Sequence, residues 1–303
     1  MRKLLFVSCI CFFSFYTCDD GDVLDIEFDF DETFQVCGTN DLVFYKTKSD
    51  PSESLSIIIA NLTLEELLDV DETGVYEADF SLSTTNTFNY ITYSNATLPN
   101  NLFCNDIPLS EIKIIKDLES TSGNVHIKTV LTEDDNDGIP AALEDVNGNG
   151  DLTDDDTDGD GIPNYLDEDD DGDNVLTKNE KPDPNGDGNL SDALDTDGDG
   201  IPNYLDDDDD GDGVKTRDEE NESQDQNPSN DTSLNGIADY LNIEVATTVP
   251  ATAYREHTIY KTYLVTLTVS NFDLQIISLD VFDFGVLANS ALSTSRKETP
   301  NFN

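Results

Sequence analysis

Oxygen-bearing side chains recur at a fixed spacing between residues 133 and 242. Each unit places an oxygen-bearing side chain, nearly always Asp, Asn or Glu, at its positions 1, 3 and 5, Gly or Asn at position 6, and usually an acid at position 12. Side chains at positions 1, 3 and 5 converge on one point, the residue at position 6 permits a sharp turn, and the acid at position 12 closes the shell. Such sets of hard oxygens suit Ca²⁺, because Mg²⁺ requires a tighter octahedron and Zn²⁺ prefers His and Cys.

Eight windows follow this spacing, five of them strongly, so we predict five to eight bound Ca²⁺ ions. The fifth window is weaker because Leu194 stands at its position 12, and the eighth is degenerate. The predicted ligands, window by window, are Glu133, Asp135, Asp137 and Glu144; Asp145, Asn147, Asn149 and Asp156; Asp156, Asp158, Asp160, Asn164 and Asp167; Asp169, Asp171, Asp173 and Glu180; Asp183, Asn185 and Asp187; Asp195, Asp197, Asp199, Asn203 and Asp206; Asp208, Asp210, Asp212 and Glu219; and Asp231, Ser233, Asn235, Asp239 and Asn242.

The spacing belongs to a duplicated unit. The twelve residues from Asp156 to Asp167 recur unchanged from Asp195 to Asp206, an offset of 39 residues. A repeat of this length is the signature of an array of similar units. Only a few residues separate one loop from the next, too few for the flanking helices of an EF-hand.

The tract from 133 to 242 also holds most of the negative charge. It carries 38 acidic and 4 basic side chains, a net charge of −34 out of −51 for the 303-residue chain. A surface this negative repels phosphate backbones, so we exclude nucleic acid as a partner. Composition alone would equally fit a disordered tail or a linker, and the spacing is what favours a folded tract.

The unit Asp-x-Asp-x-Asp-Gly-x-x-Asn-x-x-Asp resembles the thrombospondin type 3 repeat, in the form found in surface lipoproteins of Bacteroidetes, over residues 133–242. The resemblance implies that the chain wraps around a row of Ca²⁺ ions, which replace most of the hydrophobic core. Each repeat has few aliphatic side chains, too few to offset a chain entropy of about 1–2 kcal/mol per residue. We therefore expect folding of the tract to be coupled to calcium binding.

The first residues predict a location in the cell envelope. Met1 to Lys3 is basic, and residues 4–15 form an apolar run too short to span a bilayer. Residues 1–17 resemble a bacterial lipoprotein signal peptide that ends before Cys18. The alternative is an ordinary secretory signal cleaved nearby. The resemblance implies an outer-membrane lipoprotein, held in the membrane by acyl chains on Cys18. The acids that follow Cys18, at 19, 20 and 22, resemble the surface-export signal of Bacteroidetes lipoproteins, which implies exposure at the cell surface.

Two further cysteines, Cys37 and Cys104, remain after such a signal. In an oxidising compartment a pair of thiols suggests a disulfide, and two buried free thiols are the alternative.

The regions on either side of the tract show the alternation of β-strands. We predict strands at residues 24–30, 42–47, 55–62, 75–82, 88–93, 112–116 and 125–131, with a helical turn at 64–70, and strands at 257–269 and 274–284, with 243–249 as a further candidate.

The fold class predicted from these elements is mostly β: a β-sandwich-like domain combined with a calcium-stabilised, irregular repeat tract. The domain comprises residues 18–132 and the tract residues 133–242. The strands in 243–290 are too few to bury a core of their own, so we expect them to complete the first domain, followed by a polar tail at 291–303. A separate C-terminal β-unit is the alternative.

No catalytic motif stands out, and we expect both histidines, His126 and His257, to face solvent from strands. The sequence thus predicts a non-catalytic, calcium-binding surface lipoprotein with a structural or adhesion role, whose β-domain binds a glycan or a protein. The alternative is an enzyme or enzyme accessory, acting on glycans or associated with an isomerase, with its site in the β-domain.

Overall fold

The computed structural model describes residues 28–105, 109–275 and 277–302. The predicted signal peptide, Cys18 and most of the strand predicted at 24–30 lie outside the described residues. Within the described ranges, no helix has the length and apolar character needed to cross a bilayer.

Ten strands in the described part of the chain join into one mixed sheet. Their order is β4-β7-β8-β9-β1-β2-β3-β5-β6, with β10 paired to β8; all neighbours are antiparallel except β1 and β9. The strands are β1 (Thr33–Cys37), β2 (Asp41–Ser49), β3 (Ser52–Ala60), β4 (Val75–Ser81), β5 (Thr87–Tyr93), β6 (Ile114–Ser120), β7 (Asn124–Asp134), β8 (His257–Asp273), β9 (Ser278–Leu287) and β10 (Ser293–Glu298).

The prediction that the chain is mostly β is confirmed, but the strands form one continuous sheet where we expected a sandwich of two. The link is β1, a short strand that the sequence analysis missed: Gln35 pairs with Tyr45 of β2, and Thr33 pairs with Val286 of β9. One buried core contains side chains from both halves of the sheet, including Phe44 of β2 and Val265 of β8. The halves therefore share a hydrophobic core although hydrogen bonds join them edge to edge.

The single α-helix of the described residues, α1 (Leu64–Leu68), confirms the helical turn predicted there. Thr63 and Glu66 form a reciprocal capping box at its start, which satisfies backbone donors that a short helix leaves free. A disulfide joins Cys37 at the end of β1 to Cys104, with the two Cα atoms 5.3 Å apart.

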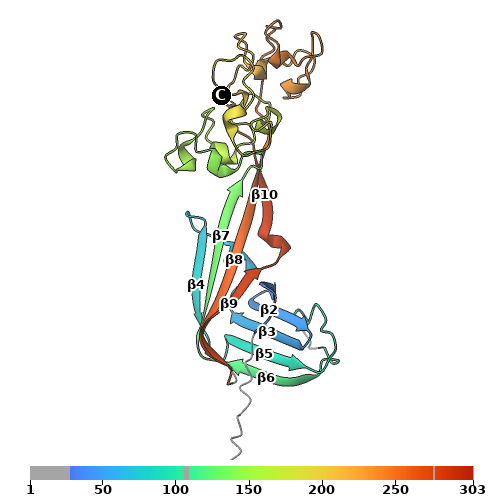
Figure 1. The fold of residues 1–303 in the computed structure, drawn as a ribbon, viewed down its shortest axis with the longest axis vertical. Helices are drawn as coiled ribbons and strands as arrows, with labels where there is room; N and C mark the ends of the chain where they lie inside the picture. Colours follow the sequence, from blue (N-terminus) through green and yellow to red (C-terminus); the bar gives the residue numbers. More distant parts are fainter. Residues whose placement is uncertain (1–27, 106–108, 276, 303) are drawn as a thin grey trace, which may run out of the picture.

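The acidic tract leaves the sheet at the end of β7 and returns at the start of β8. Figure 1 shows it beyond the ends of the long strands β7 and β8 and of the short strand β10, away from β2, β3, β5 and β6. Ile162 and Leu166 of the tract pack on Ile259 of β8. Short 3₁₀ helices are its regular elements: η1 (Ala141–Leu143), η2 (Leu152–Asp154), η3 (Asn164–Leu166), η4 (Thr177–Asn179), η5 (Leu190–Asp192), η6 (Asn203–Leu205), η7 (Thr216–Asp218), η8 (Pro228–Asn230) and η9 (Asp239–Leu241); η10 (Ser290–Leu292) lies before β10.

The last strand, β10, lies in a segment that we predicted to be a polar tail. Its residues pair with the start of β8, from Ser293 opposite Thr262 to Glu298 opposite His257. The sequence STSRKE lacks the apolar alternation that marks a half-buried strand, so only the pairing partner reveals it.

Candidate metal centre

Three of the windows, 133–144, 169–180 and 208–219, have Glu at position 12 and share one local geometry. They are called the long loops below. In the first, Asp135 Oδ1 accepts the N–H of Asp137 at 3.0 Å, and Asp137 Oδ1 accepts the N–H of Ile139 at 2.8 Å. These turns between aspartate side chains and the backbone consume one oxygen of each carboxylate. The other oxygen of each, Oδ2, is left to face the centre of the loop.

The acid at position 12 follows a turn of 3₁₀ helix in each long loop. The N–H of Glu144 donates to the carbonyl of Ala141 at 3.2 Å, and Glu180 and Glu219 make the same bond to Thr177 and Thr216. Fixing the backbone in this way brings the carboxylate at position 12 back to the carboxylates at positions 3 and 5.

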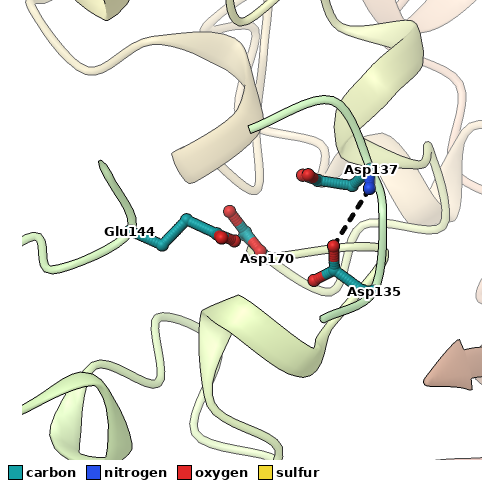
Figure 2. Close-up of side chains that lie close together, drawn as sticks. All are labelled: Asp135, Asp137, Glu144 and Asp170. Carbon is teal, nitrogen blue, oxygen red and sulfur yellow. Dashed lines mark hydrogen bonds between the residues drawn. The ribbon is translucent and has the colours of Figure 1, made fainter. Parts of the chain in front are cut away.

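The first cluster consists of Asp135, Asp137, Glu144 and Asp170, all buried. One oxygen of each lies within 4.8 Å of the others. Figure 2 shows the carboxylates of Glu144 and Asp170 pointing toward each other and toward the turn that carries Asp135 and Asp137. Both oxygens of Glu144 and of Asp170, and Oδ2 of Asp135 and Asp137, have no hydrogen-bond partner among the described residues.

The second cluster repeats the first in the next long loop. Asp171, Asp173, Glu180 and Asp209 are all buried, and their oxygens meet the same limit of 4.8 Å. Both oxygens of Glu180 and of Asp209 again find no hydrogen-bond partner within the part of the chain that the structure describes. Glu180 and Asp209 are only 1% and 2% exposed, so bulk solvent does not reach these carboxylates.

Each cluster is completed by an aspartate from the following long loop, which the sequence analysis did not find. Asp170 and Asp209 stand at position 2 of their own loops, between two predicted ligands. Their backbone N–H groups donate to the hydroxyls of the buried threonines Thr177 and Thr216, at 3.2 and 3.3 Å. The carboxylates therefore point away from their own loops and into the preceding one. Asp209 and Thr216 repeat Asp170 and Thr177 at an offset of 39 residues, and this repetition was the available signal.

Burial and mutual repulsion disfavour the charged form of these carboxyl groups. Desolvation, followed by the charges of its neighbours, raises the pKa of Asp135 to about 10 and that of Glu144 to about 9. The same causes raise the pKa values of Asp171, Asp173 and Glu180 well above the ordinary range. Each cluster brings together four buried carboxyl groups with free oxygens, and among the described residues no Lys, Arg or His forms an ion pair with them. Such a set fits a hard divalent cation, which would favour their charged forms.

The third long loop has the same pattern at a more open place. One oxygen each of Asp208, Asp210 and Asp212, and both oxygens of Glu219, have no hydrogen-bond partner among the described residues. The window that follows, 231–242, has Thr232 at position 2 and so supplies no aspartate equivalent to Asp170 and Asp209.

The third, fifth and sixth windows place most of their acids nearer to solvent, whereas Asp167 of the third window and Asp231 and Asp239 of the eighth are buried. Asp156, Asp158 and Asp160 lie close together but are exposed or half-buried, and Asp195, Asp197 and Asp199 are exposed. Asp183 and Asp187 are joined by Asp192, which was not among the predicted ligands. In the second window the amides of Asn147 and Asn149 donate to Asp154 at 3.0 and 3.2 Å, so hydrogen bonds within the loop already occupy them.

Several predicted ligands have other bonding partners. Asn164 and Asn203 each accept an N–H and donate to a hydroxyl of a threonine in the same loop, Thr157 and Thr196. Glu133 forms an ion pair with Lys261 of β8 at 3.2 Å. Asp231 and Asp239 accept hydrogen bonds from neighbouring backbone and side chains, including those of Ser223 and Ser233. Asn235 lies exposed on a turn with positive φ.

His257 differs from the expectation that it faces solvent. It is 2% exposed, and its Nδ1 lies 2.6 Å from Oδ1 of the equally buried Asp167. His126 is half-buried and lies 3.0 Å from Asp79 on the neighbouring strand. The first residue of β8 is thus attached directly to the acidic tract.

Comparison with known proteins finds a similarity over part of the tract to a family other than the predicted one. A family model described as BamM C-terminal matches residues 134–191. No curated protein and no solved structure gives a significant match to the chain. Because the matched segment lies inside the tract, the predicted resemblance to thrombospondin type 3 repeats was wrong. The predicted function, a calcium-binding adhesion lipoprotein, falls with it, and the match gives no support to the enzyme alternative.

Proposed function

We propose that this chain is a non-catalytic protein of the cell envelope that takes part in outer-membrane protein assembly, and that divalent cations order its acidic tract. The first part is supported by the match of residues 134–191 to BamM C-terminal, a family of the outer-membrane assembly machinery. The match supports association with the outer membrane or with that machinery as a partner. The tract stands at the far end of the β7–β8–β10 strands, where a partner can reach it (Figure 1).

The observation that carries the second part is the pair of buried carboxylate clusters. Leaving Glu144, Asp170, Glu180 and Asp209 charged and unpaired in the interior would cost several kcal/mol per group. A hard divalent cation at each cluster removes this cost, and oxygen-only ligands favour Ca²⁺ over softer metals. The cation is a structural component in this proposal and takes part in no reaction.

Calorimetric titration of the full chain with Ca²⁺ and with Mg²⁺ tests cation binding. We expect at least two Ca²⁺ ions to bind, one for each buried cluster. Tyr204 and Tyr240 are buried in the tract and the chain has no Trp, so near-ultraviolet circular dichroism reports tract order through tyrosine. Absence of both a binding heat and a chelator-reversible tyrosine signal would contradict cation binding.

A separate experiment tests the assembly role. The full chain, tagged and cross-linked in intact cells, should co-purify with components of the outer-membrane assembly machinery, and its deletion should lower the amount of folded outer-membrane β-barrel proteins. A matched strain carries Glu144→Gln and Glu180→Gln, which disturb the tract and leave the sheet residues unchanged. Unchanged β-barrel levels in the deletion strain, together with no co-purified component, would argue against the role.

We also propose that Cys18 anchors the chain to the outer membrane. The support is the basic start, the apolar run at 4–15 and the acids that follow Cys18. Metabolic labelling with a fatty acid should label the natural chain and not a Cys18→Ser variant. Protease treatment of intact cells would then distinguish exposure at the cell surface from a periplasmic orientation.

A further inference from the structure

The second long loop departs from its two relatives at position 6. Gly138 and Gly213 hold this position in the first and third loops, with φ of 113° and 93°. In the second loop the residue is Asn174, with φ of 73°. Glycine adopts positive φ freely, and asparagine is among the residues that tolerate it best. The backbone of the loop is thus preserved while a side chain is gained.

That side chain is completely buried, and both its nitrogen and its oxygen are hydrogen-bonded. The amide Nδ2 of Asn174 donates to the carbonyl of Ala253 at 3.2 Å, and Oδ1 accepts the N–H of Arg255 at 3.2 Å. The side-chain amide therefore pairs with the backbone of the distant segment in the way a neighbouring strand would. The backbone carbonyl of Asn174 also accepts the guanidinium of Arg255 at 3.1 Å.

The segment that Asn174 holds leads directly into β8. Residues 250–256 form neither helix nor strand, and β8 begins at His257. Just beyond, the N–H of Thr258 donates to Glu168 Oε2 at 2.8 Å, and His257 contacts Asp167. His257 and Thr258 pair with Glu298 and Lys297 of β10. The second long loop, through Asn174, and the two residues just before it, Asp167 and Glu168, thus hold the chain where the β8–β10 pair begins.

The other side of Asn174 belongs to the cation loop. Its N–H donates to Asp169 Oδ2 at 3.0 Å, and Asp173 beside it is a member of the second buried cluster. Drawing Asp171, Asp173, Glu180 and Asp209 together around a cation would therefore fix the backbone from which the Asn174 amide projects. The equivalent Gly213 is exposed and has no side chain with which to form such a link.

We propose that Asn174 is the positioning residue that couples the cation loop 169–180 to the sheet, so that cation binding orders residues 253–258 and the start of the β8–β10 pair. This inference rests on the proposed cation binding. It adds that the cation orders more than the tract. Through Asn174 it also fixes the connection between tract and sheet, and so the direction in which the tract projects.

Hydrogen exchange at single-amide resolution, with and without Ca²⁺, tests the coupling. In the natural chain, Ca²⁺ should slow amide exchange at Thr258 and over residues 257–262 by roughly tenfold or more, the effect of stabilising about one to two hydrogen bonds. Asn174→Gly makes the loop like its two relatives and should keep the calcium stoichiometry, but it should abolish this calcium-dependent slowing. Asn174→Asp keeps the acceptor for Arg255 and loses the donor to Ala253, so it should restore part of the effect. Gly213→Asn, the matched control, should leave the exchange of 257–262 unchanged.

The outcomes separate the inference from the function on which it rests. If Asn174→Gly alters the Arg255 amide alone and Ca²⁺ still protects residues 257–262, the side chain makes a local bond only and the coupling is refuted. If the natural chain binds Ca²⁺ with no change at 257–262, the coupling is again refuted while cation binding stands. If the natural chain binds no Ca²⁺, both fail. If Asn174→Gly does not fold, the Asn174→Asp variant decides, because an exchange pattern equal to that of the natural chain would refute the coupling.

Discussion

Substitution of Glu180 gives the most direct test of cation binding. Glu180 is 1% exposed, both its oxygens lack a hydrogen-bond partner among the described residues, and the pKa is raised well above the ordinary range by burial and by Asp173. Glu180→Gln keeps the shape and removes one negative ligand. We expect the Ca²⁺ dissociation constant of the second cluster to rise by about tenfold or more, or about 1.4 kcal/mol, in a calorimetric titration.

The control for this change is Glu222→Gln. Glu222 lies exposed in the same tract, so the variant removes the same charge without touching a cluster. Equal losses of affinity in the two variants would mean that Ca²⁺ responds only to the overall charge of the tract.

Gly172 lies where the loop 169–180 packs closely on Asp158 of the window 156–167. A Cβ at this position would stand 3.0 Å from Cβ and Cγ of Asp158, whereas one at Gly159 would meet nothing within 4 Å. Both glycines have similar positive φ, 66° and 74°, so the backbone strain of an alanine is matched. We expect Gly172→Ala to lower the free energy of unfolding by about 1–3 kcal/mol more than Gly159→Ala, measured by denaturation in Ca²⁺. Equal losses would mean that the loops do not pack as described.

At the scale of the element, each long loop depends on the next. Asp209 belongs to the loop 208–219 but lies in the cluster of the loop 169–180, and Asp170 serves the loop 133–144 in the same way. Asp170 and Asp171 are adjacent in the chain yet belong to different clusters. Filling one cluster should therefore restrict the backbone that completes the other, which favours cooperative uptake.

Asp209→Asn tests this dependence. It should weaken binding at the loop 169–180, 29 or more residues away in sequence, by about tenfold, because a buried ligand loses its charge. Asp207→Asn is the control: Asp207 is the ion-pair partner of Lys215 and lies outside the cluster. Both variants are titrated with Ca²⁺, with tyrosine dichroism as readout. Equal Ca²⁺ affinities would mean that the carboxylate of Asp209 does not contribute to the cluster of the loop 169–180.

For the whole molecule, the division between sheet and tract predicts two responses to cation removal. The sheet has a continuous hydrophobic core and a disulfide, while the tract has a net charge of −34 and small apolar clusters. In a chelator, the tract should expand by self-repulsion and the radius of gyration from X-ray scattering should increase, while far-ultraviolet dichroism keeps its β signal.

Excess cation should reverse the expansion, and each filled site adds about 2.7 kcal/mol of stability at a concentration of 100 times its dissociation constant. High salt without divalent cation serves as the control, because it screens charge but does not fill the clusters. Identical scattering in chelator and in Ca²⁺ would show that the tract folds without a cation.

The sequence alone determined the features that arise within a few residues of each other. Alternating side chains predicted most strands, and the spacing of the acids at positions 3, 5 and 12 predicted three of the four carboxylates that meet in each buried cluster, because a loop folds on its own turns. The same local pattern predicted Asn164 and Asn203 as ligands, but it could not reveal that their side-chain amides are hydrogen-bonded to threonines of their own loops.

Only the tertiary structure decided which residues from separate loops meet. Asp170 and Asp209 join clusters, Asn174 reaches Ala253, and His257 is buried against Asp167 because one loop packs on the next and the chain returns along them. The short β1 and the polar β10 are strands because they find partner edges in β2, β9 and β8. Contacts of this kind depend on the positions of two distant backbones, and no spacing within either segment specifies them.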